Sequence, residues 1–73
     1  MSNRISKRER VLRAAESSFR SDGYRSSVDG IARRAGVAKQ TVYHYFPSKD
    51  DLFKEVTRGY AHRLLVELHA GLD

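Results

Sequence analysis

The segment K-Q-T-V-Y-H-Y-F at positions 39–46 carries side chains suited to recognising DNA. At about 100° per residue on a helix, Gln40 and His44 would lie almost opposite Val42, with Lys39 beside them. A lysine can donate to guanine O6 and N7, and a glutamine can pair with adenine N6 and N7; a good bidentate pair contributes about 1–3 kcal/mol of discrimination. The polar side of this helix is therefore suited to reading base edges. The alternative is a small amphipathic helix that simply exposes its polar side to solvent.

Other polar side chains of the same helix suit a nucleic-acid backbone. Thr41, Tyr43 and His44 have short, stiff polar tips that can bind phosphate oxygens, which fixes register without reading sequence. Tyr45 has the same chemistry, although its periodicity also assigns it to the inner flank of the helix, next to Phe46. We expect these residues to hold the DNA backbone while Lys39 and Gln40 read bases.

A second short helix precedes this one and would position it. Gly36 can adopt the left-handed conformation that ends a helix, and Val37 is expected to fill the turn. Two helices joined in this way over about residues 28–46 form a helix-turn-helix, whose second helix can enter the major groove. The apolar residues of the first helix recur at the spacing of one helix face: Val28, Ile31, Ala32 and Ala35.

The helix ends carry recognisable signals. Ser27 is placed to cap the first short helix, and Pro47 pushes the residue before it out of the helical region, which ends the second. Ser48 and Asp51 form a capping box that opens a long helix, with Lys49 as its first residue.

The run D-G-I-A-R-R-A-G-V-A-K-Q-T-V-Y-H-Y-F-P-S-K-D-D-L-F resembles the signature of the TetR (tetracycline-repressor) family of transcriptional regulators. The resemblance includes A-G-V, T-V-Y-x-Y-F and S-K-x-x-L-F at the expected spacing, and it extends from about Lys7 to about Tyr60. It implies an all-α fold, in which a homeodomain-like three-helix bundle is followed by the start of a long fourth helix. It also implies that Ser27 and Lys49 bind DNA phosphate at their helix starts.

The resemblance further implies the partners. Members of the TetR family bind near-palindromic double-stranded DNA as two units, and they continue into a larger helical domain that binds a small-molecule effector and forms the homodimer. We therefore expect a cytoplasmic, sequence-specific regulator, a repressor by family habit, with no cofactor and with effector binding only through a C-terminal domain absent here. Two residues depart from the common pattern: Gly30 replaces a frequent Glu, and Ala38 replaces a frequent capping Ser or Thr, each at a cost of about 1 kcal/mol.

The segments before the helix-turn-helix are expected to brace it. Residues 1–6 form a flexible basic arm whose Arg4 either stays solvated or reaches a groove or phosphate. From Lys7 to Arg20 the pattern is helical, opened by a capping box and ended at Gly23, after which Tyr24 is expected to pack its ring into the core. The face turned to the core comprises Val11, Leu12, Ala15 and Phe19, and the mostly solvated polar face comprises Lys7, Arg8, Arg10, Arg13 and Arg20.

The last helix has a two-part apolar pattern. Its early apolar residues, Leu52, Phe53 and Val56, can cover the three-helix unit. Apolar residues recur every four positions from Leu52 to Leu72, and on a 3.6-residue helix such a row rotates by about 40° with each step. Its later members must therefore face away from the three-helix unit. We therefore assign residues 7–60 to the DNA-binding domain and residues 61–73 to a continuing connecting helix. The later apolar residues are Leu64, Leu65, Leu68 and Leu72.

Composition is consistent with this assignment. The 73 residues carry a net charge of +5, with 11 Lys and Arg against 4 Asp and Glu in residues 1–49 and 3 against 5 in residues 50–73. The positive part contains the helix expected to read DNA, as a polyanion-binding surface requires. The absence of cysteine excludes disulfides and thiolate chemistry, and no apolar run approaches the roughly 20 residues that span a bilayer.

Two other classes of function remain to be weighed. Residues 60–72 suggest a protein-interaction or dimerisation module in which DNA binding is incidental. An enzyme is not indicated, because the Ser, His and acidic residues form no nucleophile elbow or triad-like local motif. His62 and His69 fall on one helix face with Glu55, but without a fuller ligand set they are interpreted as surface residues, and no metal site is expected.

Overall fold

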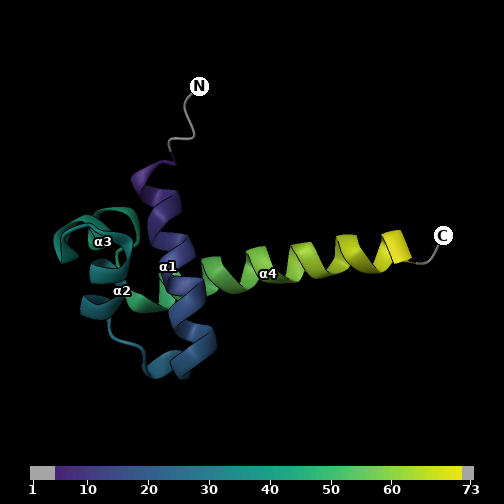
Figure 1. The fold of residues 1–73 in the computed structure, drawn as a ribbon, viewed down its shortest axis with the longest axis horizontal. Helices are drawn as coiled ribbons and strands as arrows, with labels where there is room; N and C mark the ends of the chain where they lie inside the picture. The colour runs from purple at the N-terminus through teal and green to yellow at the C-terminus, as the bar shows by residue number, and fades with distance from the viewer. Residues whose placement is uncertain (1–4, 72–73) are drawn as a thin grey trace.

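The structure is a computed structural model that describes residues 5–71, with side chains described through Leu68. Four α-helices and one 3-10 turn follow in order: α1 (Lys7–Asp22), η1 (Gly23–Arg25), α2 (Val28–Ala35), α3 (Lys39–Tyr45) and α4 (Lys49–Gly71). Figure 1 shows α1, α2, α3 and the start of α4 gathered at one end, while the C-terminal half of α4 projects away. The described residues contain no strand, which confirms the all-α prediction.

One apolar core joins the four helices. Ile31, Leu52, Val11 and Val42, from α2, α4, α1 and α3 respectively, are its largest fully buried side chains. Burying each of them contributes about 1.5–3 kcal/mol relative to full exposure, so the core fixes α3 against α1, α2 and the start of α4. The buried core also includes Ala14, Ala15, Phe19, Val28, Ala32, Ala35 and Phe46.

The turn between α2 and α3 has the predicted backbone. Gly36 adopts φ 74° and ψ 34°, and its N–H donates to the carbonyls of Ala32 and Arg33. Val37 then donates to the carbonyl of Ala32 at 3.0 Å and packs, half-buried, against the core. The left-handed glycine thus ends α2 and turns the chain into α3.

The predicted capping serines lie at their helix starts. The Ser6 hydroxyl accepts from the N–H of Glu9, that of Ser27 accepts from Gly30 at 3.0 Å, and that of Ser48 accepts from Asp51 at 3.1 Å. Ala38, by contrast, makes no side-chain cap at α3. The start of α3 therefore depends on backbone hydrogen bonds and packing alone.

Tyr24 differs from its prediction. Its side chain is 45% exposed rather than buried in the core, because it lies in η1, after α1 has ended at Gly23 with φ 74°. Its ring stacks on Phe19 with centroids 6.3 Å apart and meets Phe53 edge-on at 5.0 Å. The ring covers the core at its margin, which leaves the hydroxyl free to donate to Asp50.

Two arginines from the polar face of α1 make contacts that the sequence did not predict; Arg10 is half-buried, whereas Arg8 stays exposed. The Arg10 guanidinium donates to the carbonyl oxygens of Ala35 and Gly36, so it joins α1 to the end of α2. The Arg8 guanidinium lies 5.0 Å from the centroid of the Phe46 ring, at the end of α3. These two side chains brace the helix-turn-helix from behind.

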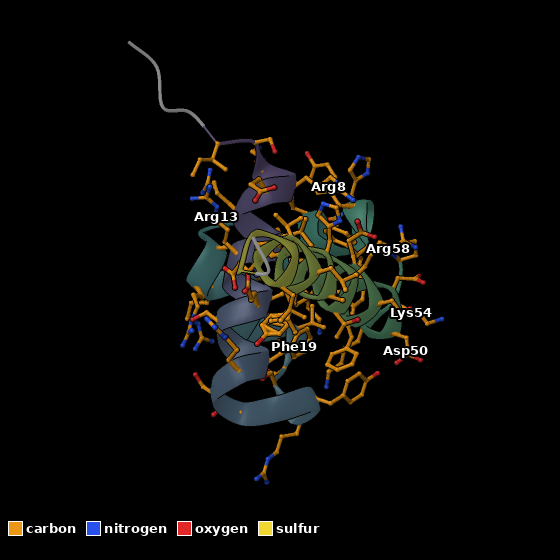
Figure 2. All side chains as sticks on the ribbon, turned by 90° about the vertical axis from the view of Figure 1, so that its right-hand side faces the viewer. Arg8, Arg13, Phe19, Asp50, Lys54 and Arg58 are labelled. Carbon is orange, nitrogen blue, oxygen red and sulfur yellow. The ribbon has the colours of Figure 1, made fainter. Side chains whose placement is uncertain are left out.

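The two halves of α4 differ as the apolar pattern predicted. Leu52 is fully buried, and Phe53 and Val56 pack half-buried against the core. Figure 2 shows Phe19 between α1 and α4, whereas Asp50, Lys54 and Arg58 point from the side of α4 away from α1. The exposed apolar residues of α4 are Tyr60, Leu64, Leu65, Val66 and Leu68, and Leu72 lies outside the described residues. No helix in the described part of the chain is long and apolar enough to cross a membrane.

Candidate nucleic-acid interface

The core fixes which side of α3 is turned outward. Val42 is 1% exposed and Phe46, the residue that ends the helix, is 4% exposed. On the opposite side of this seven-residue helix, Gln40 and His44 are exposed, and Lys39 is exposed at the start of the helix. The polar strip predicted from the sequence is therefore on the surface and available to a ligand.

Tyr43 and Tyr45 occupy different environments on α3. Tyr43 is 40% exposed and lies on the outer side with His44. Tyr45 is half-buried against the core, and its ring meets that of His44 edge-on with centroids 5.0 Å apart. Tyr45 thus packs on the inner flank, the alternative that its periodicity left open, while Thr41 is also half-buried.

Lys39, at the start of α3, is paired within the protein. Its ammonium lies 3.4 Å from Oδ1 of Asp29 in the first turn of α2. Both side chains are more than half exposed, so this ion pair contributes at most about 1 kcal/mol to stability. The Lys39 ammonium can therefore leave the Asp29 carboxylate for a phosphate or a base edge at little cost in free energy.

Ser27 and Lys49 lie at the starts of α2 and α4. Ser27 is exposed and caps α2. Lys49 is half-buried, and its ammonium lies 4.4 Å from the centroid of the Tyr24 ring. Figure 1 shows the start of α4 at the same end of the molecule as α2 and α3.

Three contacts of this surface were not predicted from the sequence: the ion pair of Lys39 with Asp29, the hydrogen bond of Tyr24 with Asp50, and the ring contact of Lys49. The Tyr24 hydroxyl has a raised pKa, because it donates to the Asp50 carboxylate and is partly desolvated beside that charge. Each contact joins side chains from different helices or turns. No local pattern in the sequence signals them.

Metal ligands do not gather here or elsewhere in the described part of the chain: no group of three or more His, Asp or Glu side chains there could hold an ion. The side chain of His69, weighed above with His62, lies outside the described residues, as does Arg4 of the arm.

A short helix held across a glycine turn, with its polar side exposed, defines a helix-turn-helix DNA-binding domain. The family model of bacterial regulatory proteins of the tetR family matches residues 11–56. The chain is also 38% identical over 53 residues to the uncharacterized HTH-type transcriptional regulator YhgD of Bacillus subtilis (strain 168), a match that covers 71% of this chain and 28% of that protein. The chain belongs to the TetR family of DNA-binding transcriptional regulators, which are not enzymes.

Proposed function

We propose that two copies of this domain bind a near-palindromic operator in the cytoplasm and repress transcription, each with α3 in the major groove. The observation that carries the proposal is the exposure of Gln40 and His44 on α3, opposite the buried Val42. A helix whose inner side is fixed by the core and whose outer side is polar can approach base edges without rearrangement of the core.

The side chains have distinct proposed roles. Lys39 and Gln40 contact base edges, where lysine and glutamine match guanine and adenine. The remaining residues hold the sugar-phosphate backbone: Ser27, Thr41, Tyr43, His44, Tyr45 and Lys49. Of these, Tyr45 packs half-buried against the core, so we assign it the smallest contribution.

The partners proposed for the whole regulator are those common among members of the TetR family. It acts as a homodimer, and a small-molecule effector binds a further C-terminal domain. A single DNA-binding unit would bind DNA with a Kd of about 10⁻⁴–10⁻⁶ M at physiological salt. Dimerisation raises this affinity by engaging both half-sites of the operator.

Selection from random duplex DNA with the dimeric protein tests this function. We expect a near-palindromic consensus, and we expect Gln40→Ala to relax preference at one base position in each half-site. His62→Ala, at an exposed position of α4, is the control and should leave the consensus unchanged. An identical profile for Gln40→Ala and the wild-type protein would show that Gln40 does not read sequence.

The exposed apolar residues of α4 support a second candidate, a module for protein interaction. Leu64, Val66 and Leu68 are 46%, 55% and 58% exposed. Sedimentation with and without duplex DNA separates the candidates. A tight dimer indifferent to DNA favours interaction alone, whereas a dimer that sediments with duplex favours the regulator.

A further inference from the structure

The start of α4 lies against an aromatic ring from outside the helix-turn-helix. Tyr24 is in η1, and its ring face lies 4.4 Å from the ammonium of Lys49. Contacts with Phe19 and Phe53 hold the ring, and its hydroxyl donates to Asp50, one residue after Lys49. The ring is therefore fixed by the core on one side and by α4 on the other.

This arrangement restricts the Lys49 side chain. A free lysine samples many rotamers and loses that freedom when it binds a phosphate. The negative face of an aromatic ring attracts an ammonium group, so the Tyr24 ring favours a subset of those rotamers before DNA arrives. Within the described residues, the Lys49 ammonium has no carboxylate within ion-pair distance, so its charge remains available to a phosphate.

We propose that Tyr24 is a positioning residue for DNA binding: its ring holds the Lys49 ammonium in place for a backbone phosphate, and its hydrogen bond to Asp50 orients the ring. The inference rests on the proposed function, because it takes Lys49 as a phosphate contact. Tyr24 acts through Lys49 and need not touch DNA.

A double-mutant cycle tests the coupling. Tyr24→Leu removes the ring face but keeps an apolar side chain, and Tyr24→Phe keeps the ring. We expect Tyr24→Leu to weaken binding to the selected duplex by about two- to five-fold, and Tyr24→Phe to have a smaller effect. In a Lys49→Ala background, Tyr24→Leu should cause no further loss.

The double-mutant cycle distinguishes a Tyr24 that acts through Lys49 from a Tyr24 that only stabilises the fold. An equal loss from Tyr24→Leu with and without Lys49 would mean that Tyr24 acts through the fold alone, and the proposal would be overturned. If the wild-type protein binds duplex DNA without the salt dependence of phosphate contacts, the proposed function fails as well. When the wild-type protein and Lys49→Ala behave as expected, only the role of Tyr24 is at issue.

A second measurement keeps the test decisive if Tyr24→Leu unfolds. The ring face of Tyr24 should shift the NMR signals of the Lys49 Cε protons upfield in the free wild-type protein, and Tyr24→Phe should retain that shift. Signals at the positions typical of a solvated lysine in both proteins would overturn the proposal.

Discussion

The guanidinium of Arg10 donates two hydrogen bonds to the carbonyl oxygen of Ala35, from Nε at 3.2 Å and from Nη2 at 3.0 Å. Nη2 also donates to the carbonyl of Gly36 at 3.1 Å. The last carbonyls of α2 have no partner within their own helix, so a side chain from α1 satisfies them. This link sets the position of the turn, and through the turn it sets the position of α3.

We expect Arg10→Ala to destabilise the domain by about 1–2 kcal/mol, because hydrogen bonds from a charged donor are stronger than neutral ones and two carbonyls would lose their partner. Urea unfolding followed by circular dichroism measures the change. Arg13→Ala is the matched control, since the guanidinium of Arg13 forms an exposed ion pair with Glu9 at 3.5 Å, and it should cost less than about 0.5 kcal/mol. Equal effects of the two substitutions would contradict a bracing role for Arg10.

The backbone at Gly36 yields a second prediction. With φ at 74°, an added Cβ would be strained, and it would lie 3.0 Å from Nη2 of Arg10. We expect Gly36→Ala to lower the free energy of unfolding by about 1–2 kcal/mol. Gly59→Ala, within α4 where a Cβ meets nothing within 4 Å, should instead raise it by about 0.5–1 kcal/mol. Thermal unfolding of both variants checks the pair, and a stabilising Gly36→Ala would contradict the assigned turn.

These examples show which features local sequence could predict. Gly36, Ser27 and Ser48 were predicted correctly because turns and caps are decided by residues within three or four positions. The partners of Arg10 and Tyr24 were not, because they lie 25 or 26 residues away along the chain. Long polar side chains select such partners only after the helices have packed. The helical pattern therefore placed Arg10 on the solvated face of its helix, and Tyr24 was expected in the core. Whether the residues of α3 contact DNA as expected stays a prediction.

The hydrogen bond between Tyr24 and Asp50 predicts a pH dependence at alkaline pH. The carboxylate raises the pKa of Tyr24 above its ordinary value of 10.0, so the folded state retains the proton longer than the unfolded state. The stabilisation from this bond is therefore fully present below about pH 10 and is lost as pH rises through the folded pKa. An NMR titration of the Tyr24 ring should show a lower midpoint in Asp50→Asn. Asp51→Asn is the control and should leave the midpoint nearly unchanged, because the backbone N–H of Asp51 donates to the capping Ser48 hydroxyl and its carboxylate has no part in the bond from Tyr24.

The pair of Lys39 with Asp29 predicts that removing a carboxylate strengthens DNA binding. Asp29 competes with DNA for the Lys39 ammonium, which lies 3.4 Å from its Oδ1. Because an exposed ion pair contributes at most about 1 kcal/mol, we expect Asp29→Asn to tighten binding by about two- to five-fold. Competition titrations with specific and random duplex measure the change.

Asp22→Asn is the control for that prediction, because it removes the same charge from an exposed position at the end of α1. Release of Lys39 predicts that Asp29→Asn tightens binding and Asp22→Asn has a smaller effect. Asp29 also lies in the first turn of α2, where a carboxylate stabilises the helix by about 0.3–1 kcal/mol, so the stability of both variants must be measured alongside binding. If the two substitutions tighten binding equally, a general change in net charge explains the effect, and the ion pair does not restrain Lys39 before DNA binds.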